Sequence, residues 1–379
     1  MRDALAERLL ARVMDWTSAD VAREWPRLQA IAAYKYDTYQ QYAPGMRFIE
    51  SFASWLNQFP SIPHKRVAYN FVMTRLVFCS SAEMDHLVGV AYPDHIRPLL
   101  LQTTAADLTL EPWRVGRVAQ SVEFRVRQRR CLFLGLSDGA RIDQFRRANQ
   151  GALSHEQIYQ TYEIASDRVD SLLKKLGSDL ATLLGKNVPA DMRTFRTVVL
   201  LDDFSASGMS YLRRNASGEF DGKIYKLFRS LTTMANHTSR LIDAHHVEIA
   251  LVLYMASEQA RASIQRVADE LRQVSGVPVT WHIMVVYPLS ADVGLREKVG
   301  DPMSELINLH YDHAVHDEHM RVGGAADSKY GFGSCGLPLV LSHNTPNNSI
   351  ALLWSYDGLK VRGLFPRVRR HEAAGIASP

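Results

Sequence analysis

Residues 197–210 read TVVLLDDFSASGMS, and this stretch decides the fold. The four apolar residues from Val198 to Leu201 form a continuous β-rich run, which is typical of a strand buried on both faces of a sheet. Two adjacent acids, Asp202 and Asp203, stand where this strand ends. Open α/β sheets bind ligands at the carboxyl ends of their strands, so the stretch predicts a binding site beside the two acids.

The segment after the acids has the composition of a phosphate-binding loop. Its hydroxyl donors and loop residues are Ser205, Ser207, Gly208, Met209 and Ser210. The glycine lets a ligand approach the backbone closely, and the loop is expected to open a helix whose first N–H groups bind an anion. Because two adjacent acids can accept hydrogen bonds from the paired hydroxyls of a ribose, the whole stretch predicts a ribose-phosphate site.

Strands and helices alternate on both sides of this stretch. The expected strands are residues 131–136, 198–201, 247–255, 279–286 and 337–341, and the expected helices are residues 155–185, 221–241 and 258–274. Residues 124–130, FRVRQRR, alternate in polarity and are expected to form a basic strand. The alternation predicts an α/β fold with a parallel sheet and right-handed crossovers.

The amino-terminal part of the chain has a different character. Apolar residues recur at helical spacing through residues 1–115, which predicts a helical region that caps the sheet domain. Residues 116–370 are expected to form the α/β domain, and residues 371–379 a mobile tail.

Composition excludes several classes of protein. The 379 residues are 46% hydrophobic and 22% charged, as in an ordinary globular protein, and the net charge of +4 does not favour nucleic acid. No apolar run approaches the ~20 residues of a membrane span, and no signal peptide is expected at the amino terminus. The three cysteines are far apart and fit no disulfide framework or zinc pair, so we expect a cytoplasmic protein without a membrane partner.

His155, in the segment NQGALSHEQ at residues 149–157, is a candidate acid or base. The alternative is that Ser154 caps the following helix and Gln157 completes a capping box. One segment can serve both purposes.

The 198–210 pattern resembles the phosphoribosyl-pyrophosphate (PRPP) motif of type I phosphoribosyltransferases, in which four apolar residues precede two acids and a Thr/Ser-Gly loop. The resemblance implies a phosphoribosyltransferase-type sheet, with PRPP or a nucleotide as ligand and Mg²⁺ as cofactor. Asp202 and Asp203 would bind the ribose and the metal, and residues 207–210 would bind the 5′-phosphate. Ala206 stands where the family usually has Thr or Asp, and an alanine cannot transfer a proton. The resemblance therefore supports ligand binding better than catalysis.

Residues 137–141, SDGAR, lie one strand–helix unit earlier, where that family binds the pyrophosphate of PRPP. By this resemblance Asp138, Gly139 and Arg141 are candidate ligand residues, although Asp138 would repel a diphosphate unless a metal bridges the two. The alternative is a plain strand-to-helix turn, since Asp-Gly is a common turn pair.

The carboxyl-terminal string HNTPNN, followed by LLW, offers Asn344, Asn347, Asn348 and Trp354 as an acceptor or base pocket. Asn and Pro are also ordinary turn residues, so turn chemistry is the alternative. Together with the acidic strand, the string resembles a phosphoribosyltransferase-like family of bacterial conflict and anti-phage loci, including retron-associated members. That resemblance implies a protein or nucleic-acid partner in a defence complex.

Two basic clusters, at residues 125–130 and 362–370, are candidate phosphate-backbone contacts. Three hypotheses follow from the sequence. The first is an enzyme that acts on PRPP or a nucleotide, and the second is an inactive regulator that binds such a ligand and signals to a partner. The third is a structural subunit that binds nucleic acid.

Overall fold

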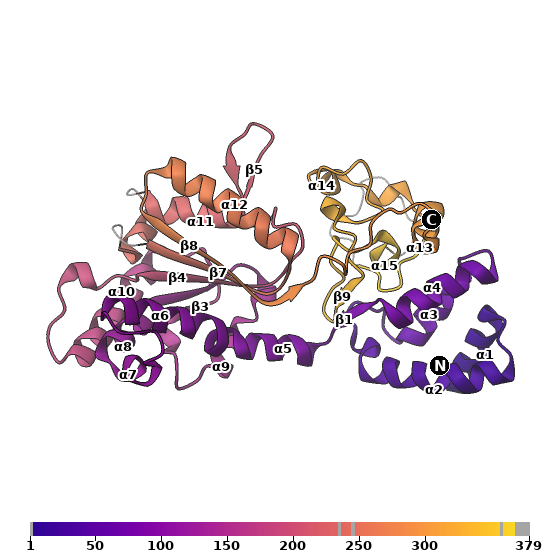
Figure 1. The fold of residues 1–379 in the computed structure, drawn as a ribbon, viewed down its shortest axis with the longest axis horizontal. Coiled ribbons are helices and arrows are strands. Elements are labelled where there is room, and N and C mark those ends of the chain that lie inside the picture. The colour runs from indigo at the N-terminus through magenta and orange to yellow at the C-terminus, as the bar shows by residue number, and fades with distance from the viewer. Residues whose placement is uncertain (1–2, 234–235, 244–246, 357–358, 368–379) are drawn as a thin grey trace. The chain divides into compact units, whose positions relative to one another are not determined.

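The computed structural model describes residues 3–233, 236–243, 247–356 and 359–367. Contacts within the chain divide it into two compact units, residues 1–83 with 291–379 (unit 1) and residues 84–290 (unit 2) (Figure 1). This division differs from the boundary expected at residue 115. Strand β1 (Val77–Cys79) pairs in parallel with β9 (Leu339–Leu341), so the last part of the chain folds with the amino-terminal helices. The expected tail, residues 371–379, lies outside the described residues.

Unit 1 is built mainly from helices that share one apolar core. Its α-helices are α1 (Asp3–Met14), α2 (Ser18–Tyr34), α3 (Phe48–Asn57), α4 (Ile62–Thr74), α13 (Pro302–Leu309), α14 (Glu318–Arg321) and α15 (Ala351–Trp354). Phe365 lies in the middle of this core and packs against Tyr36 and Phe48 with ring centroids 5.9 and 5.8 Å apart. The hydroxyl of Tyr39 donates to the Phe365 carbonyl at 3.1 Å. The two ends of the described chain therefore stabilise one core.

Unit 2 contains a five-stranded parallel sheet in the order β3-β2-β4-β7-β8. The strands are β2 (Cys131–Gly135), β3 (Ile158–Tyr159), β4 (Thr197–Ser205), β7 (Val247–Ser257) and β8 (Val279–Leu289). The helices are α5 (Ser81–Val90), which begins in unit 1, the π-helix η2 (Ala91–Ile96), α6 (Arg97–Asp107), α7 (Val115–Gln120), α8 (Val122–Arg129), α9 (Ile142–Ala148), α10 (Ser166–Leu184), α11 (Lys223–Thr232) and α12 (Glu258–Ser275). The expected α/β fold with a parallel sheet is confirmed.

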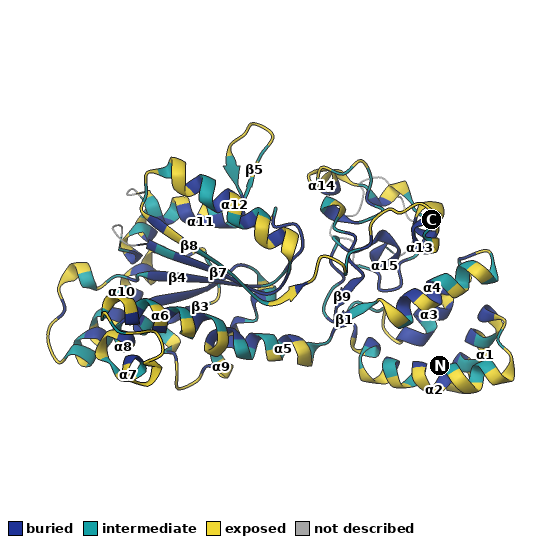
Figure 2. Cartoon of the chain, viewed as in Figure 1, coloured by how far each residue is buried: buried dark blue, intermediate teal, exposed yellow. Residues whose placement is uncertain are grey.

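Both faces of the sheet are covered, as the continuous apolar strands predict. One face packs against α10, α11 and α12 in a single apolar core. On the other face, the ring of Phe133 contacts those of Tyr92 and Phe145, from η2 and α9. Figure 2 shows β4 and β7 as buried strands over most of their length. No helix among the described residues is long and apolar enough to cross a membrane.

The strand order creates a switch point between β2 and β4. The chain leaves β2 toward β3 on one side of the sheet, whereas it leaves β4 toward β7 on the other side. Connections that diverge in this way open a crevice at the carboxyl ends of the two strands, where α/β proteins bind ligands. The loops at residues 136–141 and 206–210 therefore both lie at this switch point.

Three expected elements differ in the structure. Residues 124–130 lie mostly in helix α8, not in a strand, because Phe124 and Arg127 are buried on one side at a three-residue spacing. The expected helix at 155–185 is divided into the turn η4 (His155–Gln157), strand β3 and helix α10. The helix expected at 221–241 is divided likewise, since α11 ends at Thr232 and the turn η6 (His237–Leu241) is separate.

Candidate functional site

The acidic pair lies at the carboxyl end of β4, and the carboxylate of Asp202 is held on both oxygens. Asp202 is 1% exposed. Its Oδ1 accepts hydrogen bonds from the Ser137 hydroxyl and, at 3.1 Å, from the Asp203 N–H. Its Oδ2 accepts from the Tyr211 hydroxyl at 2.9 Å and lies 3.5 Å from Lys223 Nζ. Four donors from unit 2 thus surround this one carboxylate.

The electrostatics of Asp202 follow from that burial. The pKa of Asp202 is raised to about 6, first by burial and then by the adjacent Asp203 carboxylate. The Lys223 ammonium and the hydrogen bonds from Ser137 and Tyr211 act in the opposite direction. The carboxyl of Asp202 therefore exchanges its proton near pH 6.

The carboxylate of Asp203 has different contacts from that of Asp202. It is half-buried, and its Oδ1 accepts from the Phe204 N–H at 2.8 Å. Its carboxyl group lies against Gly139 of the neighbouring loop, where an added Cβ would come within 2.5 Å of the carboxyl carbon. A glycine at position 139 therefore allows the two loops to approach each other.

The turn that contains Gly139 is the short 3₁₀ segment η3 (Asp138–Ala140). The Ser137 hydroxyl accepts from the Gly139 N–H at 3.1 Å, and the Ala140 N–H donates to the Ser137 carbonyl at 3.1 Å. Arg141, in a left-handed conformation with φ 47°, pairs with Asp85 at 3.0 Å. Asp138 is exposed. The turn alternative thus describes this loop, and its binding of a diphosphate stays a prediction.

The loop after β4 is held by its own serines. The Gly208 N–H donates to Ser205 Oγ at 3.2 Å, and the Met209 N–H donates to Ser207 Oγ at 3.4 Å. Gly208 has φ 77°, and a Cβ there would lie 2.9 Å from the Ala260 carbonyl oxygen, so this position requires glycine. The loop therefore packs closely against the first turn of α12.

The expectation that residues 207–210 open a helix is wrong. Ser210 is exposed and is followed by a turn and a two-stranded hairpin, β5 (Arg213–Arg214) with β6 (Phe220–Asp221). Helix α11 begins only at Lys223. An anion bound at this loop would therefore meet loop N–H and hydroxyl groups without the dipole of a directly following helix.

We predict that Gly139→Ala destabilises unit 2 by about 1–3 kcal/mol, because the added methyl group displaces the Asp203 carboxyl or the turn. Urea unfolding measures the free energy of unfolding. Gly89→Ala in α5 is the control, since no atom lies within 4 Å of a Cβ there, and it should cost nothing. An equal free energy of unfolding for Gly139→Ala and the wild type would contradict the close approach.

His155 lies in the capped turn η4. Ser154 and Gln157 form the expected capping box around η4, which confirms the alternative reading of this segment. His155 is exposed and lines a cavity of about 400 Å³ together with Arg146, Arg168 and other residues around β3. The described residues lining that cavity include neither acid of the pair, so a catalytic role for His155 stays a prediction.

The candidate base-pocket residues belong to unit 1, whereas the acidic pair belongs to unit 2. Trp354 is 1% exposed, and its indole N–H donates to the Ser349 carbonyl at 2.7 Å, so its ring is part of the core. The Asn348 amide donates to the Phe332 carbonyl at 3.0 Å, and the Asn344 N–H donates to the Leu341 carbonyl at 3.0 Å. The packing thus assigns these positions structural contacts; their part in a base pocket, with Asn347, stays a prediction.

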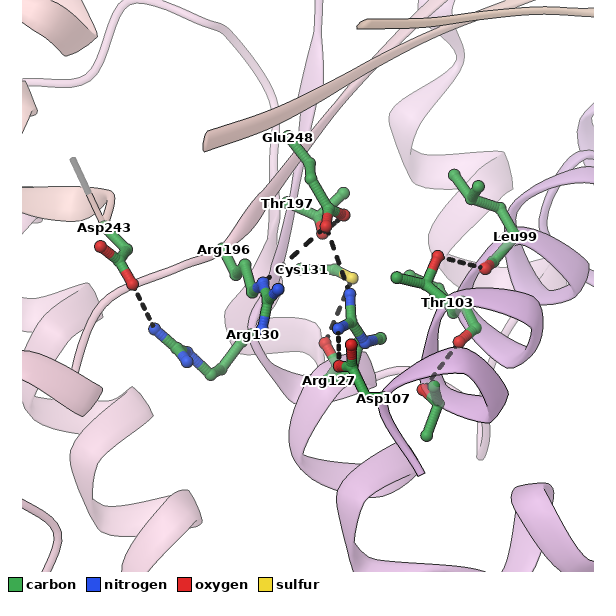
Figure 3. A network of polar contacts seen from close by, with 12 residues as sticks. Leu99, Thr103, Asp107, Arg127, Arg130, Cys131, Arg196, Thr197, Asp243 and Glu248 are labelled. Carbon is green, nitrogen blue, oxygen red and sulfur yellow. Dashed lines mark hydrogen bonds and ion pairs between the residues drawn. The ribbon is translucent and has the colours of Figure 1, made fainter. Parts of the chain in front are cut away.

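The first basic cluster is mostly interior. Figure 3 shows Arg127 between Asp107 and Glu248, near the amino ends of β2, β4 and β7. Arg129 pairs with Asp179, and both Arg127 and Arg129 are 6% exposed. Arg127 therefore connects α8 to strand β7, Arg129 connects it to helix α10, and neither offers a basic stripe to a nucleic acid. In the second cluster, Arg369 and Arg370 lie outside the described residues.

Sequence reasoning missed three residues that contact Asp202, namely Ser137, Tyr211 and Lys223. In the sequence Ser137 indicates only a turn, and Tyr211 follows directly after the stretch 197–210. Lys223 follows the β5–β6 hairpin, and no short-range pattern in the sequence predicts that its side chain reaches Asp202.

Comparison with known proteins identifies the family of this chain. The family model PRTase-CE matches residues 52–367, which is most of the chain. No curated protein and no solved structure gives a match. A phosphoribosyltransferase-like family, a parallel sheet and an acid pair at the switch point are mutually consistent, and the chain belongs to the PRTase-CE family.

Proposed function

We propose that unit 2 binds PRPP or a nucleotide through its ribose phosphate, together with Mg²⁺. The observation that carries the proposal is the half-buried Asp203 at the switch point, between the loop of Gly139 and the Ser/Gly loop at 205–210. Carboxylates accept hydrogen bonds from sugar hydroxyls, and a serine- and glycine-containing loop supplies hydroxyl and N–H donors to a phosphate. Membership of a phosphoribosyltransferase-like family supports the same ligand.

The residues at the site fit one Mg²⁺ ion that is shared with the substrate. Mg²⁺ is usually bound by one or two carboxylates plus substrate phosphates and water, and no cluster of three or more Asp, Glu, His or Cys among the described residues is placed to cage a metal. Asp203 can serve as the single carboxylate, whereas the oxygens of Asp202 already accept from protein donors. The ion would neutralise the diphosphate charge.

In this proposal Asp203 orients the ribose, and its negative charge favours the positive charge that develops on the ribose ring as the glycosidic bond breaks. The loop at 205–210 holds the 5′-phosphate. The Ala206 side chain is buried and carries no titratable group, so the loop itself supplies no base. This alanine favours the second candidate, a regulator that binds the ligand without turnover and serves a partner in a defence system.

Calorimetry with PRPP and Mg²⁺ tests the proposal. An assay for released pyrophosphate or base then distinguishes its two forms, an enzyme and a regulator without turnover. We expect binding of PRPP that requires Mg²⁺. Release of product identifies the enzyme, and saturable binding without release identifies the regulator. Absence of binding to PRPP, AMP and ribose 5-phosphate alike would overturn both forms.

A further inference from the structure

Asp202 contacts three segments around the carboxyl end of β4. Ser137 begins the turn after β2, Tyr211 ends the turn after the Ser/Gly loop, and Lys223 begins α11. The side chains of Ser137, Tyr211 and Lys223 all contact the carboxylate of Asp202, which is on strand β4. Removal of this group would therefore loosen three segments that are far apart in the sequence.

These contacts occupy most of the hydrogen-bonding capacity of Asp202. A carboxylate has about four lone-pair positions, and here four donors lie on its two oxygens. A ribose hydroxyl could reach Asp202 only by displacing one of them, and displacing the Ser137 hydroxyl or the Asp203 N–H would take its acceptor from a donor inside the protein, which is costly. At 1% exposure, the carboxyl is also closed to solvent. Its neighbour Asp203 is half-buried instead.

Tyr211 connects the network to the loop backbone. Its hydroxyl lies 2.9 Å from Asp202 Oδ2 and 3.0 Å from the Phe204 carbonyl oxygen, and its single proton can serve only one of the two at a time. The Ser137 hydroxyl has a similar double role, since it donates to Asp202 while accepting from the Gly139 N–H. Asp202 thus contacts the turn at 137–141 through Ser137 and the loop at 205–211 through Tyr211.

We propose that Asp202 is a positioning residue, which couples the turn at 137–141 to the loop at 205–211 through Ser137 and Tyr211, and that Asp203 is the acid of the pair that meets the ligand. The coupling stands on the contacts alone, and the role of Asp203 rests on the proposed function. The two acids, although adjacent and identical in type, therefore have separate tasks. The burial of Asp202 argues against an exchange of roles between them.

Hydrogen–deuterium exchange on the ligand-free protein tests the coupling. Asp202→Asn replaces one acceptor oxygen with an amide nitrogen, so at least two of the four donors lose their acceptor. We expect exchange at Gly139, Ala140, Gly208 and Tyr211 to accelerate about tenfold in both loops together, with helix α12 unchanged. Tyr211→Phe and Ser137→Ala should each accelerate the same two segments, and Asp203→Asn should leave the loop at 205–211 unchanged. If Asp202→Asn does not fold, Tyr211→Phe and Ser137→Ala test the coupling in its place.

Acceleration in only one loop, or none in any network variant, would overturn the coupling. A calorimetric arm with Mg²⁺ and PRPP then tests the roles of the two acids. Asp202→Asn should weaken binding about tenfold while its dependence on Mg²⁺ persists, whereas Asp203→Asn should lose that dependence. The reverse pattern would overturn the assignment. Failure of the wild type to bind PRPP would refute the proposed function and leave the exchange result standing.

Discussion

Asp203→Asn is expected to weaken the binding of PRPP in the presence of Mg²⁺ by about 100-fold. Two hydrogen bonds to a charged group contribute roughly 3 kcal/mol together, and roughly 1.4 kcal/mol corresponds to a tenfold change in affinity. The substitution preserves the shape of the side chain and the acceptor for the Phe204 N–H, so the fold should be retained. Calorimetry of the full chain, with circular dichroism as a test of folding, measures the change.

Asp143→Asn is the matched control for the loss of one negative charge. Asp143 lies on α9 in the same unit, its side chain is 66% exposed, and it pairs only with Arg146 among the ion pairs of the described residues. Its substitution should change the affinity for PRPP by less than about twofold, because surface ion pairs contribute little. Equal weakening by Asp143→Asn and Asp203→Asn would mean that net charge, not a direct contact, determines binding.

Local patterns predicted the centre of unit 2 correctly. The apolar run before Asp202 lies in strand β4, which extends beyond the expected end through both acids to Ser205. The runs at 131–136, 247–255 and 279–286 form strands of the same parallel sheet. Continuous β-rich runs separated by amphipathic segments carry this information over short distances in the sequence. The strand order then places the acidic pair at the switch point, which composition alone does not determine.

The features that the sequence did not reveal depend on contacts between distant residues. Strand β1 pairs with β9 across more than 250 residues, so the composition of neither end predicts unit 1. The segment at 124–130 alternates in polarity like a strand, but in the structure Phe124 and Arg127 are buried on helix α8, where Arg127 pairs with Asp107 and with Glu248 of a distant strand. Short patterns cannot carry that kind of information.

The separate tasks of the two acids also could not be predicted from the sequence, because they depend on contacts with distant residues. In the sequence Asp202 and Asp203 are equivalent, and both were expected to bind the ribose and the metal. Successive side chains on a strand point to opposite faces, so neighbours in the sequence meet different surroundings. Asp202 meets Ser137, Tyr211 and Lys223, whereas Asp203 lies against the turn of Gly139.

Asp202→Asn is expected to remove a pH dependence from the stability of unit 2. The pKa of Asp202 is raised from 3.8 to about 6 in the folded protein by burial and by Asp203. Between these two values the unfolded chain releases the proton while the folded protein keeps it, so ionisation favours unfolding as pH rises. The shift of roughly two pKa units corresponds to about 3 kcal/mol, present below pH 4 and lost as the pH rises through 6.

Urea unfolding of both proteins from pH 4 to pH 7.5 measures this effect as a difference, in which the contributions of the other carboxyl groups cancel. The free energy of unfolding of Asp202→Asn relative to the wild type should rise by up to about 3 kcal/mol across that interval. Asp203→Asn should shift the wild-type transition to lower pH, because it removes one cause of the raised pKa. A difference between Asp202→Asn and the wild type that stays constant from pH 4 to pH 7.5 would show that the buried carboxyl does not titrate in this range, and that burial by the four donors leaves its charge fully compensated.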